Sequence, residues 1–288
     1  MIELTDVTKR YGRTVAIDRM TLAIPDNGIY CLLGRNGAGK TTLMKLLAGH
    51  ITATDGEISV CGNRVARGRM PECVSYIESG ALQFDMEVGR LIDMACDLAE
   101  DFDKDFAGKM LGKFNLDAGK KYKKLSFGMK TMLTTIISLS NNSEVILLDE
   151  PTLGFDAIMR DQFNTLLLES YECHPRIIVV STHLIDEIAK VTEYLMVIEE
   201  GRMLLKTGIG EIDEKAYTLS GLTSSVMPLL DGLNCIGKTE MGSVMAAHIY
   251  DERIPVPDGV TVERMSLQDF FINFVGGKGN ESGGKSHE

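Results

Sequence analysis

A glycine-rich turn in the segment "CLLGRNGAGKTTL", Cys31 to Leu43, constrains the fold of this chain more than any other feature. The apolar residues before the turn predict a strand, and "TTLMKLLAGH" after it carries apolar residues at helical spacing. Residues 34–41 fit the pattern GxxxxGK[ST] between that strand and that helix, which is the context this motif requires. A strand, a glycine turn and a helix in this order predict an α/β fold that holds the phosphates of a nucleotide.

The turn offers several phosphate contacts at once. Its glycines let successive backbone N–H groups converge on phosphate oxygens, and the helix N-terminus adds a favourable dipole. We expect Lys40 to reach the β- and γ-phosphates and Thr41 to place its hydroxyl on Mg²⁺. The predicted nucleotide-binding residues of the turn are Gly34, Asn36, Gly37, Ala38, Gly39, Lys40, Thr41 and Thr42.

The segment "VILLDEP" supplies the second half of a nucleotide site. Its four apolar residues predict a buried strand whose end presents Asp149, and a carboxylate there can hold Mg²⁺. Glu150 follows directly and suits a general base that aligns the water attacking the γ-phosphate. A bare "DE" after an apolar run is common, so this prediction depends on the phosphate-binding turn that precedes it.

Composition and charge narrow the remaining possibilities. A formal charge of −11 argues against a general nucleic-acid binder, because neutralising phosphates takes clustered Lys and Arg. The six cysteines have neither metal-ligand nor disulfide spacing, which predicts free thiols in a reducing cytoplasm. No apolar run approaches the roughly 18 residues of a membrane span, and the first residues lack the apolar core of a signal peptide. We therefore expect any role at a membrane to come through a partner.

The order of predicted elements divides the 288 residues into blocks. Residues 1–24 alternate apolar and polar side chains, which predicts antiparallel strands broken near Tyr11-Gly12. The pattern over about 87–140 is mostly helical, whereas "EVILLDE" and "RIIVVST" are typical of buried parallel strands. We predict three parts: an α/β ATPase domain over residues 1–209, a small α+β appendage over 210–275, and a disordered tail over 276–288.

The segment "LSFGMK", Leu125 to Lys130, stands before a predicted helix and ahead of "VILLDEP". With it, residues 1–209 resemble the nucleotide-binding domain of ATP-binding cassette (ABC) transporters, whose LSGGQ signature other phosphate-loop ATPases lack. In that family, the signature of one subunit closes over the γ-phosphate bound by its partner. The resemblance implies that Ser126 and Gly128 act on ATP in trans. Phe127 and Met129 replace the second glycine and the glutamine of the signature, as in variants from bacterial exporter ATPases.

Three further positions follow from the resemblance. Tyr11 lies where the family places an aromatic ring that stacks on adenine, and the alternative is a structural tyrosine at a strand end. "PTLGFDA" is similar to the loop that ends with an aspartate crossing the dimer interface, here Asp156. His183 in "VVSTHLIDE" resembles the switch histidine that contacts the γ-phosphate, although a lone histidine is more often structural or exposed.

One position departs from the family pattern. The family has a glutamine near the end of the strand "CVSYI" that joins the helical insertion to Mg²⁺ and the attacking water, but this chain continues "ESGALQFD". Glu78 or Ser79 takes the expected place, and Gln83 lies too far along the chain. A Glu78 oxygen could still coordinate Mg²⁺, although a carboxylate cannot donate as an amide does. The alternative for Glu78 is a surface glutamate.

Taken as a whole, the resemblance implies an ABC-type P-loop ATPase core with an N-terminal antiparallel β-subdomain, a helical insertion and the small C-terminal appendage. Two copies, or this chain and a different cassette, would sandwich two ATP molecules and drive a separate membrane-spanning permease from the cytoplasmic face. The signature and the appendage are similar to export systems for peptides or antibiotics. Two alternatives remain: a cytosolic ABC protein that acts as a scaffold without transport, and a regulatory switch that hydrolyses ATP poorly.

Overall fold

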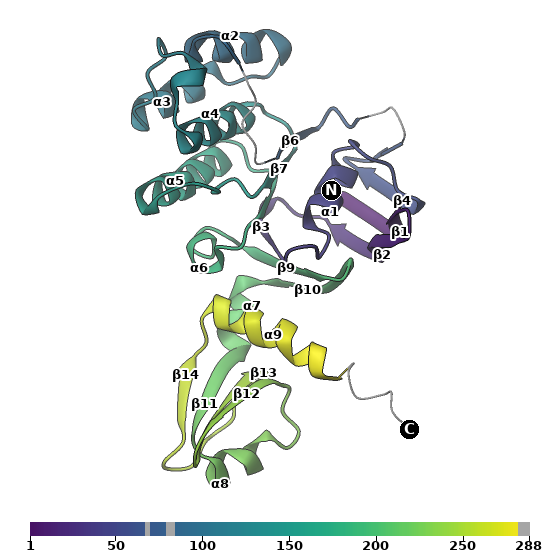
Figure 1. Cartoon of the computed structure of the whole chain (residues 1–288), viewed down its shortest axis with the longest axis vertical. Helices are drawn as coiled ribbons and strands as arrows, with labels where there is room; N and C mark the ends of the chain where they lie inside the picture. The colour runs from purple at the N-terminus through teal and green to yellow at the C-terminus, as the bar shows by residue number, and fades with distance from the viewer. Residues whose placement is uncertain (67–69, 79–83, 282–288) are drawn as a thin grey trace. The chain divides into compact units, whose positions relative to one another are not determined.

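The computed structural model describes residues 1–66, 70–78 and 84–281 (Figure 1). Internal contacts divide the chain into two compact units, Met1–Lys206 and Thr207–Glu288. The division falls close to residue 209, after which the sequence predicts the appendage to begin. Within the described residues, no helix is both long and apolar enough to cross a membrane.

An antiparallel sheet with the strand order β2-β1-β4-β5 opens the first unit. The alternating pattern of residues 1–24 forms its hairpin, and the predicted break at Tyr11-Gly12 is the turn of that hairpin. Apolar residues from one face of this sheet pack into the main core of the unit, together with the first helix and a face of the second sheet. The strands are β1 (Ile2–Tyr11), β2 (Thr14–Ile24), β4 (Asp55–Val60) and β5 (Asn63–Arg64).

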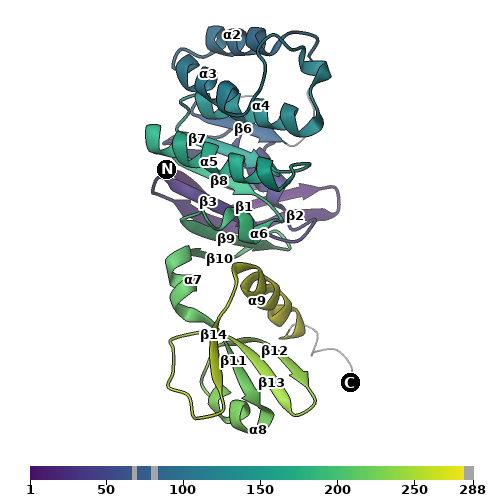
Figure 2. The same ribbon diagram turned by 90° about the vertical axis from the view of Figure 1, so that its left-hand side faces the viewer.

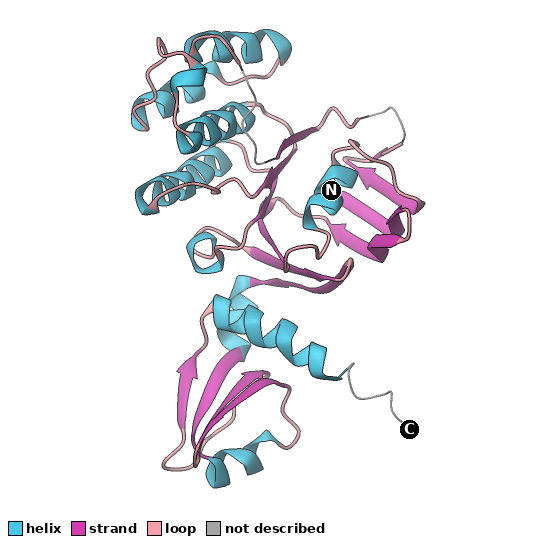
Figure 3. Ribbon diagram, viewed as in Figure 1, coloured by secondary structure: helices cyan, strands magenta, loops and turns pink. Residues whose placement is uncertain are grey.

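The strands of both units are magenta in Figure 3. The second sheet of the first unit has the order β10-β9-β3-β8-β7-β6, and its pairs from β9 across to β6 are parallel. Every residue of β3, β7 and β8 is buried, because helices or the first sheet cover both faces. The apolar runs "EVILLDE" and "RIIVVST" therefore form the central parallel strands that their composition predicts. The strands are β3 (Gly28–Leu33), β6 (Val74–Glu78), β7 (Val145–Asp149), β8 (Ile177–Ser181), β9 (Tyr194–Glu199) and β10 (Arg202–Gly208).

Helices lie on both faces of the parallel sheet, with α1 on one face and α4 and α5 on the other (Figures 1 and 2). The predicted helical insertion consists of α2, α3, a short 3₁₀ segment and α4. The α4 helix packs against β6 and β7, so the insertion is joined directly to the sheet. The helices are α1 (Lys40–Leu47), α2 (Val88–Leu98), α3 (Lys104–Lys113), η1 (Tyr122–Lys124), α4 (Phe127–Ser140), α5 (Ala157–Cys173) and α6 (Ile185–Ile188).

The second unit is an antiparallel sheet of order β12-β13-β11-β14 with its own core. Phe270 and Phe274 of its last helix pack edge-on against the ring of Tyr250. That helix continues past residue 276, where the sequence predicts a disordered tail, and residues 282–288 lie outside the described part. Its elements are α7 (Ile209–Lys215), β11 (Ala216–Leu222), α8 (Thr223–Val226), η2 (Met227–Leu230), β12 (Cys235–Met241), β13 (Val244–Tyr250), β14 (Thr261–Arg264) and α9 (Leu267–Glu281).

Candidate functional site

The glycine turn joins β3 to α1, and two of its glycines leave no room for a side chain. A Cβ on Gly34 would lie 2.5 Å from the carbonyl oxygen of Ile198. Gly39 has a φ of +111°, and a Cβ there would lie 2.6 Å from the carbonyl oxygen of Ala16. Close backbone packing therefore requires both glycines, and the left-handed backbone at Gly39 requires that one a second time, so the turn is held in one shape against the sheet.

Lys40, the first residue of α1, directs its charge into the curve of this turn. Its side chain is buried, and Nζ donates to the carbonyl oxygens of Gly34 at 2.7 Å and of Arg35 at 3.4 Å. Thr41 next to it is exposed. The predicted phosphate ligands thus lie together: a buried cation, an open hydroxyl and the backbone of the turn at a helix N-terminus.

Asp149 and Glu150 end the strand β7 at the carboxyl edge of the sheet, beside the end of β8. Ser181, the last residue of β8, donates from Oγ to Oδ1 of Asp149 at 2.5 Å and accepts from the N–H of Glu150 at 3.0 Å. Glu150 has a φ of +50°, a left-handed conformation that this residue type rarely adopts. One buried hydroxyl therefore holds both predicted catalytic carboxylate residues in place.

Sequence reasoning missed Ser181. It is the first polar residue after the apolar run of β8, but its importance depends on the register that sets it opposite Asp149. The sequence carries no direct signal for the pairing of two strands that are separated by a helix.

The predicted base and the predicted switch histidine meet in the folded chain. Nδ1 of His183 lies 2.8 Å from Oε2 of Glu150. Glu150 is mostly buried, with 21% of its side chain exposed, whereas 56% of the His183 side chain is exposed. The pair is therefore anchored on the carboxylate side and open to solvent on the imidazole side, where a phosphate or a water molecule can approach.

Glu78 ends β6 in register with Asp149, so it lies at the same edge of the sheet. Its carboxylate accepts from Nζ of Lys45 on α1 at 2.7 Å. This ion pair joins the end of β6 to the helix that follows the phosphate turn. The sequence analysis did not predict a role for Lys45. Magnesium binding by Glu78 stays a prediction, and the other two residues considered for this role, Ser79 and Gln83, lie outside the described residues.

Tyr76 lies on β6, two residues before Glu78, and its hydroxyl is buried. It has no hydrogen-bond partner among the described residues. Burial raises the pKa of Tyr76 well above its usual value, and the negative charge of Asp149 raises it further. The hydroxyl therefore stays protonated beside that carboxylate and can serve as a donor there.

Hard oxygen donors at this edge fit a magnesium ion. They are the carboxylate of Asp149 and the exposed hydroxyl of Thr41, and Mg²⁺ prefers such ligands together with phosphate oxygens and water. No cluster of three His, Cys, Asp or Glu side chains that could hold a metal exists in the part of the chain that the structure describes. The residues present fit a magnesium ion that arrives with a nucleotide.

Ser126 and Asp156 begin two neighbouring helices. Ser126 caps α4 by accepting from the N–H of Met129 at 3.2 Å, and Asp156 caps α5 by accepting from the N–H of Met159 at 2.8 Å. Gly128 packs under this junction, because a Cβ there would lie 3.0 Å from Sδ of Met159. The signature segment and the loop that ends at Asp156 thus form one surface.

That surface and the phosphate turn belong to different elements, the first to the starts of α4 and α5 and the second to the junction of β3 and α1. Within residues 1–66, 70–78 and 84–281, no hydrogen bond or ion pair joins Ser126 or Asp156 to residues 34–41. Phe127 lies over Gly154 and is 42% exposed.

Tyr11 lies at the end of β1, and its ring is half-exposed, with Nζ of Lys9 5.1 Å from the ring centroid. The structure leaves the nucleotide roles of Tyr11, Ser126 and Asp156 as predictions.

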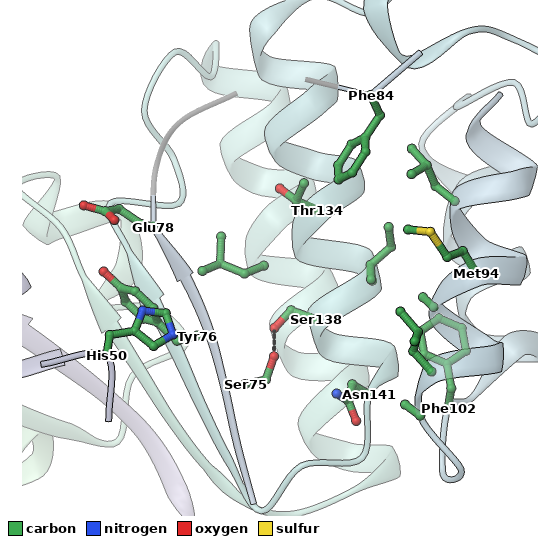
Figure 4. Close-up of a pocket in the computed structure, with 16 residues that line it drawn as sticks. His50, Ser75, Tyr76, Glu78, Phe84, Met94, Phe102, Thr134, Ser138 and Asn141 are labelled. Carbon is green, nitrogen blue, oxygen red and sulfur yellow. Dashed lines mark hydrogen bonds between the residues drawn. The ribbon is translucent and has the colours of Figure 1, made fainter. Parts of the chain in front are cut away.

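A cleft of about 690 Å³ lies between β6 and the helical insertion (Figure 4). Ser75 of β6 and Ser138 of α4 meet across its floor with their hydroxyl oxygens 2.7 Å apart. Much of the lining is apolar and includes Phe84, Met94 and Phe102. Sequence reasoning did not find this cleft, because its walls come from segments that are far apart in the chain.

Comparison with known proteins agrees with this geometry. The sequence profile of the ABC transporter family matches residues 17–153. A Nod factor export ATP-binding protein of Burkholderia lata is 32% identical over 70% of this chain and 69% of that protein. The lantibiotic transport ATP-binding protein SrtF of Streptococcus pyogenes is 29% identical over 72% of this chain and 90% of that protein. The bacitracin transport ATP-binding protein BcrA of Bacillus licheniformis is 25% identical over 96% of this chain and 98% of that protein.

Solved structures share the fold of the first unit. An ATP-binding subunit of an ABC transporter matches with a TM-score of 0.66 and 22% identity over 74% of this chain and 91% of that one. A dimeric bacterial ABC transporter cassette matches with a TM-score of 0.63 and 20% identity over 73% of this chain and 99% of that one. At these identities the likeness concerns the fold.

Proposed function

Because the chain belongs to the ABC transporter family and is one of its ATPase subunits, we propose that it powers a separate membrane permease that exports its substrate. The observation that carries the proposal is the cluster at the carboxyl edge of the parallel sheet, where Asp149, Glu150, Ser181 and His183 lie together. Export is supported by relatives that are described as export or antibiotic-transport ATP-binding proteins. The bacitracin relative also matches across both units of this chain.

The residues of the site divide the work of ATP hydrolysis. The turn and Lys40 hold the phosphates and compensate their charge, and Thr41 with Asp149 would hold Mg²⁺. The ion would neutralise charge that develops on the phosphate oxygens. Glu150 orients the attacking water and accepts its proton, and His183 steadies that carboxylate and faces the γ-phosphate.

A second cassette completes each site. Ser126, Gly128 and Asp156 form a surface of their own, away from the turn that they are predicted to serve. A second copy, or a related cassette, can place that surface over the phosphates, and two such contacts make a closed, symmetric pair. Tyr11 would stack on adenine from the same chain as the turn, because its side chain is half-exposed.

The cleft beside β6 is the surface that we assign to the permease. Its insertion side exposes Met94 and Leu98, the latter with 80% of its area open, although both are apolar. A short apolar helix of a membrane subunit can bury these side chains. Such contact would hold the chain at the inner face of the membrane. Leu98→Asp should release the chain from permease-containing membranes while ATP hydrolysis by the purified chain persists.

A complementation experiment tests the composite site. Lys40→Ala removes a phosphate ligand, and Ser126→Arg places a bulky cation on the surface that covers the partner's nucleotide. Each variant alone should hydrolyse little ATP. An equimolar mixture should recover about a quarter of wild-type turnover, since about half of randomly formed dimers are mixed and each of these holds one complete site.

Two outcomes would count against the proposal. A mixture as inactive as its components would refute sites shared between two copies. Full activity of Ser126→Arg alone would show that its surface takes no part. The control is Glu169→Gln, which removes the ion pairs of Glu169 on α5 with Lys109 and Lys113 on α3 and should mix without effect.

A further inference from the structure

A small cavity of about 10 Å³ lies beside the carboxyl end of β8, where Val180 and Thr182 line it. Thr152, in the loop after Glu150, reaches it from one side. Arg160 of α5 and Glu187 of α6 reach it from two others. A space of this size holds one water molecule when two to four polar groups face it.

Three buried polar atoms around this cavity lack a protein partner. They are Oγ1 of Thr152, Nε of Arg160 and Oε2 of Glu187, and none of them forms a hydrogen bond to any residue that the structure describes. An unpaired buried polar group lowers the free energy of unfolding by about 1–3 kcal/mol. Because three such groups line one cavity, a partner shared by all three would remove this cost.

The surrounding contacts hold these atoms in place. Nη1 of Arg160 donates to Oε1 of Glu187 at 2.7 Å, and Nδ2 of Asn164 donates to the carbonyl oxygen of Glu187 at 3.0 Å. Arg160 and Asn164 are one turn apart on α5. The short helix α6 is thereby fixed to α5 through both the side chain and the backbone of Glu187.

We propose that one buried water molecule bridges Thr152, Arg160 and Glu187, and that this bridge positions the catalytic pair Glu150–His183. The water accepts from Nε of Arg160 and donates to Oε2 of Glu187, and its third bond is to the hydroxyl of Thr152. Three bonds are the usual number for a buried water molecule.

The bridge lies between the two segments that carry the catalytic pair. Thr152 follows Glu150 by two residues in a loop where the N–H of Leu153 donates to the carbonyl oxygen of Glu150 at 3.2 Å. Glu187 lies in the helix that begins just after His183. Holding both segments on one water keeps the 2.8 Å contact between His183 and Glu150 in register. This positioning role rests on the proposed ATPase function, whereas the water site itself does not.

A crystal structure at a resolution that shows ordered water tests the site without any assay. The expected result is a water within hydrogen-bond distance of all three atoms. An empty cavity, or direct bonds among the three side chains that close it, would overturn the proposal. This outcome is independent of whether the chain hydrolyses ATP.

A matched pair of variants tests the positioning role. Thr152→Ser keeps the hydroxyl and loses a methyl group, whereas Thr152→Val keeps the methyl group and loses the hydroxyl. We expect kcat for ATP to fall about tenfold in Thr152→Val with KM unchanged, and to stay near wild type in Thr152→Ser. A side chain needed only for packing would give the opposite order, with Thr152→Ser the more damaged.

Arg160 and Glu187 should act as one unit with this water. Arg160→Met and Glu187→Gln should each lower kcat, and the double variant should lose no more than the worse single variant. Additive losses, or kcat within twofold of wild type in folded Thr152→Val, would overturn the positioning role. Glu169→Gln, which removes two other ion pairs of α5, is the control and should leave kcat unchanged.

Discussion

The two edges of the parallel sheet differ in charge: carboxylates lie at the carboxyl edge and a buried guanidinium lies at the amino edge. The carboxyl edge presents Asp149, Glu150 and His183 around an opening to solvent. At the amino edge the main buried charge is Arg176, which stands directly before β8 and is 4% exposed. One strand, β8, therefore begins at a structural cation and ends at the predicted catalytic cluster.

Arg176 supports the helix α4. Its Nη1 and Nη2 donate to the carbonyl oxygens of Asn141 at 2.9 Å and of Leu139 at 2.7 Å. Carbonyl groups at the end of a helix have no N–H partner within the helix, so they need a donor from elsewhere. Burial lowers the pKa of Arg176 to about 10, so the environment opposes the charge that these bonds use. The guanidinium acts here as a cap for the end of a helix.

The difference between the edges follows from strand direction. In a parallel sheet all carboxyl ends lie together, and helices that start there point their N-termini toward the same place. Anions are favoured at that edge. Helix C-termini gather at the other edge, where a buried cation is favoured. Substitutions at the two edges should therefore separate catalysis from stability.

The largest effect is expected at Glu150. Glu150→Gln keeps the size of the side chain but removes its charge and basicity, so kcat should fall about 10²- to 10⁴-fold while ATP still binds. Less repulsion against the γ-phosphate should let the variant accumulate as an ATP-bound dimer. Size-exclusion chromatography with and without ATP and Mg²⁺ measures this. Hydrolysis at the wild-type rate would exclude the role of Glu150 as base.

Lys40→Ala should be next in size. Removal of the cation from the turn should weaken ATP binding and lower turnover about 10²- to 10³-fold, while the thermal unfolding midpoint without nucleotide stays close to wild type. Titration with a fluorescent ATP analogue, together with an ATPase assay, checks both parts. A variant with normal hydrolysis would remove Lys40 from the site.

Ser181→Ala tests the residue that only the folded structure reveals. Without the hydroxyl, Asp149 loses a donor, and the N–H of Glu150 keeps only the backbone carbonyl of Ser181 as its acceptor, at 3.1 Å. Hydrogen bonds to charged groups contribute about 1.5–3 kcal/mol, so kcat should fall about tenfold or more. Ser181→Thr should retain most of the activity if the site accommodates the added methyl group. Equal activity of the alanine variant and the wild type would contradict this role.

Arg176→Met should have the smallest effect and the opposite pattern. The variant removes the guanidinium donors from the carbonyl groups of Leu139 and Asn141 but also removes a buried charge, so the net loss in unfolding free energy should be about 1–3 kcal/mol. Urea unfolding gives this value. The kcat for ATP, measured well below the unfolding temperature, should not change. A large loss of kcat in the folded variant would erase the distinction between the two edges.

Much of the fold could be predicted from the sequence, and most residues of the predicted phosphate site lie close together in it. The turn at residues 34–41, the buried strands that end at Asp149 and near His183, and the helical insertion all rest on local patterns. Such patterns are reliable because hydrophobic periodicity and the backbone freedom of glycine act within a few residues. The prediction that residues 276–288 are disordered was wrong at its start, because α9 continues to Glu281.

What the sequence determined by itself is therefore local: a glycine turn that fits a phosphate-binding motif, a strand that presents two carboxylates, and a signature-like segment before a helix. Only the tertiary structure decided which of these meet. The pairing of Ser181 with Asp149, the ion pair of Glu78 with Lys45 and the cavity at Thr152 depend on strand register and helix packing. These contacts join residues far apart in the chain, and a single sequence carries no local signal for them because their free energy comes from the packed core as a whole.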